Sequence, residues 1–132
     1  MNGNEVAIDT NWAVAILNGN KDFARRLKPF PVIRLPATVL GEVTYGALNS
    51  AQASVNLRRI EQLVRDCPLI PIEERVAQAY GEIRLSLKRK GKPIPDNDVW
   101  IAACCVAYDF PLATRDQHFL HVDRLQIVSM DD

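Results

Sequence analysis

One stretch decides the fold of this chain: residues 97–116, NDVWIAACCVAYDFPLATRD. Its first twelve residues are apolar on nearly every side of a helix, and such a helix belongs in the interior of a domain. The short apolar run at 111–114 follows almost directly and predicts a buried strand. We therefore expect a central helix that leads straight into the core of a sheet.

The same alternation of helix and strand extends outward from this stretch. Other helical patterns cover residues 12–17, 21–28, 38–48, 51–64 and 73–89, and a brief helical turn covers 117–120. Further short apolar runs predict strands at 6–8, 32–35, 69–72 and 125–128. Strands that alternate with helices favour a parallel sheet covered on both faces. We predict an α/β fold with a central, mostly parallel sheet of about five strands flanked by helices.

Length and composition limit the possibilities. A chain of 132 residues with 48% hydrophobic content fits one domain, residues 1–132. Its 16 Lys and Arg balance 16 Asp and Glu, so only local charge can attract a nucleic acid. The three cysteines have no spacing typical of a disulfide framework, and no apolar run approaches the roughly 20 residues that span a bilayer. We expect a cytoplasmic protein with no membrane association.

Four carboxylates lie far apart in the chain but beside elements that a sheet would bring together. Asp9 and Asp116 each follow a predicted strand, and Asp98 opens the central helix. In an open parallel sheet, residues beyond the carboxyl ends of strands converge in one crevice. Each aspartate alone is more simply a helix cap, but capping does not explain Glu42, which lies inside an amphipathic segment. The joint arrangement predicts an acidic pocket.

Such a pocket needs a cation or protons. Two carboxylates about 5 Å apart repel by roughly 3 kcal/mol at an effective dielectric near 20, and four carboxylates form several such pairs. Ligands that are all oxygen suit Mg²⁺, with Mn²⁺ as the alternative. Nothing in the pattern favours zinc.

Neighbouring polar residues leave some assignments open. Asp96 is a second carboxylate beside Asp98; we favour Asp98 for the pocket because it aligns with the apolar positions Ala102 and Cys105, which leaves Asp96 as a helix cap. His118 and His121 lie about one helical turn apart and have the chemistry of metal ligands or of an acid and base pair. We expect them instead at the surface or half-buried, because the oxygen-rich pocket already accounts for the ion.

Four strings resemble the ordered motifs of the PIN-domain nucleases: IDTN at residues 8–11, GEV at 41–43, PDNDVWIAA at 95–103 and LATRD at 112–116. Spacing and length are similar to those of VapC-type toxins of type II toxin-antitoxin pairs, over essentially the whole chain. The resemblance implies a magnesium-dependent endoribonuclease. It also implies a homodimer, and an antitoxin partner whose C-terminal segment lies over the site and places a basic side chain there.

The resemblance also implies roles for individual residues. Asp9, Glu42, Asp98 and Asp116 would be the catalytic metal ligands. Thr114 and Asn11 would support that site, and Asp96 is an additional carboxylate beside it that departs from the family pattern. Apart from the resemblance, an acidic pocket repels RNA phosphates until metal neutralises it, so we expect the nearby basic residues Lys90, Lys92 and Arg115 to guide the strand.

Two other functions remain open from the sequence. The first is an inactive PIN-like module that binds RNA or protein without cutting. The second is a magnesium-dependent phosphatase, since an aspartate after the first strand can accept a phosphoryl group. The commonest arrangement of that kind has a second aspartate two residues later, where this chain has Asn11.

Overall fold

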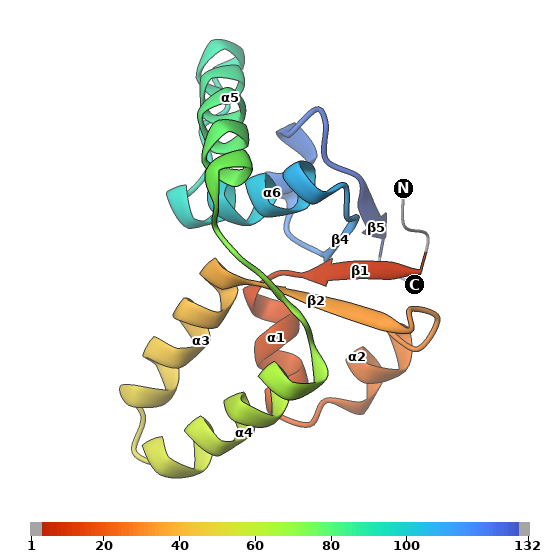
Figure 1. Cartoon of the computed structure of the whole chain (residues 1–132), viewed down its shortest axis with the longest axis vertical. Coiled ribbons are helices and arrows are strands. Elements are labelled where there is room, and N and C mark those ends of the chain that lie inside the picture. Colours follow the sequence, from red (N-terminus) through yellow and green to blue (C-terminus); the bar gives the residue numbers. More distant parts are fainter. Residues whose placement is uncertain (1–3, 130–132) are drawn as a thin grey trace.

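A five-stranded sheet lies at the centre of the protein in a computed structural model that describes residues 4–129 (Figure 1). The strand order is β3-β2-β1-β4-β5, and every pair of neighbours is parallel. The predicted parallel sheet is therefore confirmed. Its strands are β1 (Glu5–Ile8), β2 (Val32–Pro36), β3 (Leu69–Ile70), β4 (Leu112–Thr114) and β5 (Ile127–Ser129).

Helices cover the sheet from two sides. In the view of Figure 1, α5 and α6 lie above the strands and α1 to α4 lie below them. The predicted helices are confirmed, with ends that differ by no more than two residues. Their bounds are α1 (Thr10–Leu17), α2 (Lys21–Arg26), α3 (Ala37–Leu48), α4 (Ala53–Asp66), α5 (Glu74–Lys90) and α6 (Asp96–Tyr108), followed by a short 3₁₀ helix, η1 (Gln117–His121).

Local signals in the sequence explain where several helices begin and end. Asn20 is the N-cap of α2. Its side chain accepts hydrogen bonds from the backbone N-H groups of Asp22 and Phe23 in the first turn of that helix. Helix α5 ends at Gly91, which adopts the left-handed conformation with φ of 68°. Asp109 ends α6 in the same conformation with φ of 58°, which turns the chain back toward β4.

The core is built around α6, as its apolar pattern predicts. Residues 101–105 of this helix have no exposed surface, and they include Cys104 and Cys105, which pack in the core. On the opposite side of the sheet, Trp12 is buried and its ring packs against that of Phe23. Among the helices of residues 4–129, none is both long and apolar enough to cross a bilayer.

The path of the chain through the sheet determines where a site can form. From β1 the chain moves outward to β2 and β3, then returns to the other side of β1 to form β4 and β5. Such a reversal opens a crevice at the carboxyl ends of the two strands that flank it, here β1 and β4. Ile8 pairs with Ala113 in this register, so the next residues, Asp9 and Thr114, emerge side by side.

The burial of α6 predicts a large effect of truncating its side chains. We expect Ile101→Ala to lower the free energy of unfolding by about 2–5 kcal/mol, because it leaves a cavity in a closely packed core. Leu85→Ala on α5 is the matched control, since Leu85 is 46% exposed and its truncation should cost no more than about 0.5 kcal/mol. Urea denaturation measures both; equal losses would contradict the central position of α6.

Candidate metal centre

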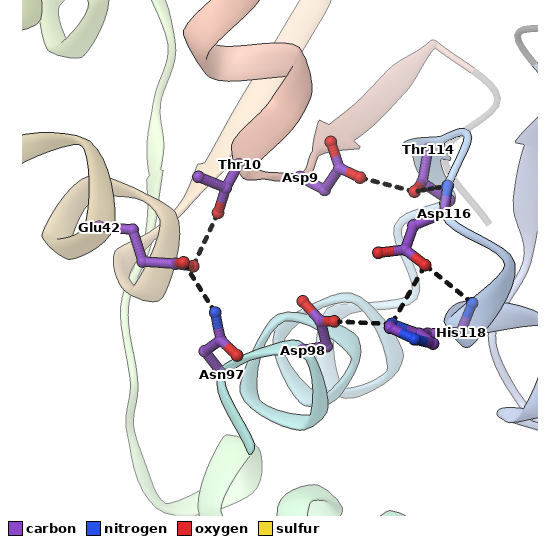
Figure 2. Close-up of polar contacts among 8 residues, drawn as sticks. All are labelled: Asp9, Thr10, Glu42, Asn97, Asp98, Thr114, Asp116 and His118. Atoms are coloured by element: carbon purple, nitrogen blue, oxygen red, sulfur yellow. Dashed lines mark hydrogen bonds and ion pairs between the residues drawn. The ribbon is translucent and has the colours of Figure 1, made fainter. Parts of the chain in front are cut away.

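Four acidic side chains from four different elements face one pocket at the crevice. Asp9 precedes α1, Glu42 lies on α3, Asp98 is in the first turn of α6 and Asp116 precedes η1. Figure 2 shows their carboxylates around a shared space. The pocket has a volume of about 180 Å³ and is lined by these four residues together with Thr10, Asn11 and Asn97. The fold thus brings together positions up to 107 residues apart in the chain.

Asp9 is held in one orientation by two donors. One carboxylate oxygen accepts the backbone N-H of Trp12 at 3.0 Å, and the other accepts the hydroxyl of Thr114 at 2.6 Å. The same hydroxyl oxygen accepts the backbone N-H of Asp116 at 2.9 Å. Asp9 is 4% exposed, so it both caps α1 and forms the buried wall of the pocket. Thr114 fixes the two aspartates relative to each other.

Glu42 is held by residues that the sequence analysis did not assign. Its Oε1 accepts the hydroxyl of Thr10 at 2.7 Å, and its Oε2 accepts the side-chain amide of Asn97 at 2.7 Å. In the sequence, each donor stands next to a motif aspartate: Thr10 follows Asp9, and Asn97 precedes Asp98. Asn11, which was assigned, lines the pocket with an exposed side chain.

His118 joins the carboxylates at the outer side of the pocket. Its Nδ1 lies 3.2 Å from Oδ1 of Asp116 and 3.4 Å from Oδ2 of Asp98 (Figure 2). The side chain is 50% exposed, as expected for a surface histidine, but its position beside two pocket carboxylates was not predicted. In the sequence, His118 stands two residues after Asp116, at the start of a helical turn, and this position already indicates that the two side chains lie close together.

Asp96 lies outside this group. Helix α6 begins at Asp96 itself, its N-cap residue is Pro95, and no side chain caps it, so the predicted capping role is wrong. The carboxylate instead accepts the Tyr80 hydroxyl and lies 3.9 Å from the guanidinium of Arg84, both on α5. Asp98, not Asp96, lines the pocket.

The three basic residues assigned to RNA have different surroundings. Lys90 donates to the carbonyl oxygen of His121 at 2.9 Å and pairs with Asp123. Lys92 is exposed in the segment between α5 and α6. Arg115 immediately precedes Asp116, and its guanidinium lies 4.7 Å from the centre of the Phe23 ring. Among these three residues, Arg115 is therefore the one next to a pocket carboxylate in the chain.

Burial and neighbouring charges oppose the ionisation of two pocket carboxylates, Asp9 and Asp98. Burial raises the pKa of Asp9 above its usual value, and the charges of Asp116 and Glu42 add to this, while the hydrogen bonds from Thr114 and Trp12 lower it. Burial also raises the pKa of Asp98. There the contact with His118 lowers the pKa, and the charges of Asp116 and Glu42 raise it. A cation in the pocket would relieve this repulsion.

The residues present fit a divalent cation. One ligand atom each from Asp98, Asp116 and His118 lies within 4.8 Å of the others, and the remaining pocket carboxylates are nearby. Several carboxylates with room for water suit a hard ion such as Mg²⁺ or Mn²⁺. Asp9, Asp98 and Asp116 are the residues that would hold it, with Glu42 at the opposite side.

Comparison with known proteins shows the family to which this fold belongs. The family model described as PIN domain matches residues 6–125. The chain belongs to the PIN domain family. Among curated relatives, this PIN domain is 28% identical to Ribonuclease VapC5 of Mycobacterium tuberculosis, over 88% of the chain and 86% of the relative. It is 29% identical to Ribonuclease VapC1 of Haemophilus influenzae, over 90% and 92% respectively.

Solved structures share the fold of this PIN domain. The VapBC2 structure from Rickettsia felis, bound to a DNA fragment from its promoter, matches with a TM-score of 0.90 at 24% identity, over 96% of this chain and 99% of the other. The VapBC-1 structure from nontypeable Haemophilus influenzae matches with a TM-score of 0.83 at 26% identity, over 95% and 97%. The likeness extends over nearly the full length of each chain.

The raised pKa of Asp98 predicts how stability changes with pH in the metal-free PIN domain. The folded state binds this proton more tightly than the unfolded chain, so the resulting stabilisation is complete below about pH 3.8 and is lost as the pH rises through the raised pKa. Asp98→Asn removes the charge that is costly at neutral pH. We expect this variant to melt above the parent at pH 7 in chelator, with the difference shrinking toward pH 4.

Thermal denaturation over this pH range provides the measurement. Glu61→Gln on the exposed side of α4 is a matched control, because it removes a carboxylate outside the pocket. It should not change the melting temperature in a comparable, pH-dependent way. A lower melting temperature for Asp98→Asn at pH 7 would contradict the electrostatic description of the pocket.

Proposed function

We propose that this protein is a Mg²⁺-dependent endoribonuclease, able to use Mn²⁺, and the toxin of a toxin-antitoxin module in the cytoplasm. The observation that carries the proposal is the single pocket lined by Asp9, Glu42, Asp98 and Asp116. Relatives that match nearly the whole chain bear the name Ribonuclease VapC, which supports RNA as the substrate. The predicted homodimer remains a prediction.

Each pocket residue has a distinct task in this proposal. A bound divalent cation would stabilise negative charge on the scissile phosphate and make an attacking water more acidic. Asp9, Asp98 and Asp116 hold the cation, and Thr114 keeps Asp9 from rotating. Glu42, fixed through both of its oxygens, ligates the cation or orients the attacking water. Because these side chains are held before substrate arrives, little reorganisation is needed during the reaction.

RNA must approach a pocket that repels phosphate. The pocket carboxylates carry negative charge, so basic groups at the rim are needed to attract the strand until the cation offsets that charge. Arg115 is the first candidate, because it adjoins Asp116 and its guanidinium stacks against the Phe23 ring. Lys92 is exposed on the segment that leads into α6. Lys90, which is paired with Asp123, would contribute only after leaving that partner.

The residue two positions after Asp9 argues against the phosphatase alternative. The commonest arrangement for a phosphoryl-accepting aspartate has a second aspartate at that position. This chain has Asn11 there, and Asn11 lines the pocket. The module that binds without cutting would not need four carboxylates in one pocket, since they repel both one another and RNA.

The test is RNA cleavage by purified protein freed of any partner, with Mg²⁺ or with chelator. We expect Asp9→Asn to slow cleavage at least about 100-fold, which corresponds to roughly 2.7 kcal/mol of activation barrier. Asp66→Asn is the matched control, because it neutralises an exposed aspartate at the end of α4, outside the pocket, and should keep the parent rate. Circular dichroism should show that both variants remain folded.

The alternatives predict other results. Cleavage that continues in chelator, or in the Asp9→Asn protein, would contradict the proposed mechanism. Hydrolysis of a phosphomonoester without RNA cleavage would indicate a phosphatase. Binding of RNA with no metal-dependent product would indicate the inactive module.

A groove beside the pocket supports the antitoxin partner. It lies between α1, α3 and α4, has a volume of about 230 Å³, and is lined on its apolar side by Val14, Leu17, Val43 and Ile60. Glu42 lines both the groove and the pocket, so the two are adjacent. We assign the groove to an apolar segment of the antitoxin that brings a basic side chain toward the carboxylates. Structures similar to this chain are VapBC complexes.

Gly46 provides a way to block this groove without disturbing the fold. It lines the groove on helix α3, and a Cβ added there would meet no atom within 4 Å. We expect Gly46→Trp to weaken binding of the antitoxin at least about tenfold, or roughly 1.4 kcal/mol. Gly81→Trp is the matched control, because Gly81 is also exposed on a helix with open space around it, but on α5.

Co-purification and calorimetry with the proposed antitoxin provide the measurement. Gly46→Trp should keep its metal-dependent RNA cleavage while losing inhibition by the partner. Equal weakening by both tryptophan variants, or by neither, would contradict the assignment of the groove.

A further inference from the structure

His118 is the feature of the site that the proposed function does not use. Its imidazole is the one nitrogen ligand within reach of the carboxylates in the cluster formed with Asp98 and Asp116. The distances from Nδ1 to the nearest oxygens of these residues are 3.4 Å and 3.2 Å. The imidazole therefore lies between two side chains that the proposed function assigns to the metal.

The distances from Nδ1 of His118 to the carboxylates of Asp98 and Asp116 can be compared with those expected around a metal ion. Ligands about 2.1 Å from one ion in octahedral geometry are about 3.0 Å from their neighbours. A hydrogen bond from a charged imidazole to a carboxylate is normally shorter, about 2.7–2.9 Å. Both contacts of Nδ1 are longer than that range. They are long for a charge-assisted hydrogen bond, and they are compatible with neighbouring ligands of a shared ion.

The position of the imidazole is set by the fold around it. The backbone N-H of His118 donates to Oδ1 of Asp116 at 2.9 Å, which ties the start of η1 to that carboxylate. The next residue, Phe119, is fully buried and anchors η1 in the core. His118 thus has little freedom to move away from Asp116, although half of its side chain is exposed. A ligand held in this way costs less entropy when an ion binds.

We propose that His118 is a metal ligand through Nδ1, and that it makes this site prefer Mn²⁺ over Mg²⁺. The proposal rests on the proposed function, because it requires that Asp98 and Asp116 hold a divalent cation. Mg²⁺ favours oxygen ligands and retains its waters, whereas a nitrogen donor favours first-row transition metals. The pocket is therefore a mixed nitrogen and oxygen site, in contrast to the all-oxygen site expected from the sequence.

The test uses Mn²⁺ as a spectroscopic probe, so it does not depend on activity. Pulsed electron paramagnetic resonance detects magnetic coupling between Mn²⁺ and a directly bonded imidazole nitrogen. The chain contains only two histidines, so the signal can be assigned if the sample carries no histidine tag. We expect a nitrogen coupling in the parent protein that disappears in His118→Asn and persists in His121→Ala.

Each of the two variants removes one of the two histidines. His118→Asn keeps a polar side chain that can place an oxygen near the position of Nδ1, so the site stays able to bind an ion. His121→Ala removes the other histidine, which lies outside the pocket. Melting temperatures close to that of the parent will show that both remain folded, as expected for side chains that are not fully buried.

Competition between the two ions tests the preference. In the parent protein Mn²⁺ should bind more tightly than Mg²⁺. His118→Asn should weaken Mn²⁺ binding by about tenfold or more and leave Mg²⁺ binding nearly unchanged, so that the preference falls. His121→Ala should retain the affinities of the parent for both ions.

The outcomes separate this inference from the proposed function. Mn²⁺ that binds to the parent without nitrogen coupling, and is lost in Asp116→Asn, would overturn the role of His118 while leaving a carboxylate site intact. Coupling that persists in His118→Asn would also overturn it. No binding of Mn²⁺ to the parent would overturn both proposals together.

Discussion

The parallel pairing of β1 with β4 is the constraint on which the rest of this site depends. It places Asp9 beside Thr114 just beyond the paired residues Ile8 and Ala113, and one hydroxyl then connects Asp9 to the backbone of Asp116. A slip of one residue between the strands would turn these side chains to the opposite face of the sheet. The apolar residues that surround β1 and β4 therefore stabilise the fold and also set the spacing of the acidic group.

The same arrangement creates a conflict between stability and function. Side chains whose ionisation is opposed by burial and by one another are unfavourable in the metal-free fold. The buried core around α6 compensates, since Ile101 and its neighbours lie within it with no exposed surface. A cation that binds only to the folded state would stabilise it further by mass action. Metal binding and folding are thus expected to be coupled in this protein.

The sequence predicted the elements well because their signals are local. The apolar run of α6 and the short buried strands each appear within a few residues. The four carboxylates line one pocket, and each lies within a predicted helix or just after a predicted strand, which is why the sequence suggested that they converge.

Contacts between side chains were harder to predict. Glu42 is held by donors 32 and 55 residues away, and no local pattern specifies such partners. Asp96 appeared to be a cap, but α6 begins one residue earlier than expected and its carboxylate turns to Tyr80 on α5. His118 was assigned correctly to the surface, yet surface exposure does not reveal which neighbours an imidazole has.

The central claim is that folding gathers these carboxylates around one divalent ion. Crystals of the partner-free protein soaked in Mn²⁺, with diffraction recorded at an energy where manganese scatters anomalously, test it most directly. The account predicts a strong anomalous peak in the pocket, within bonding distance of Asp98 and Asp116 and beside Asp9. A pocket without such a peak, or manganese bound only by residues elsewhere, would contradict the account.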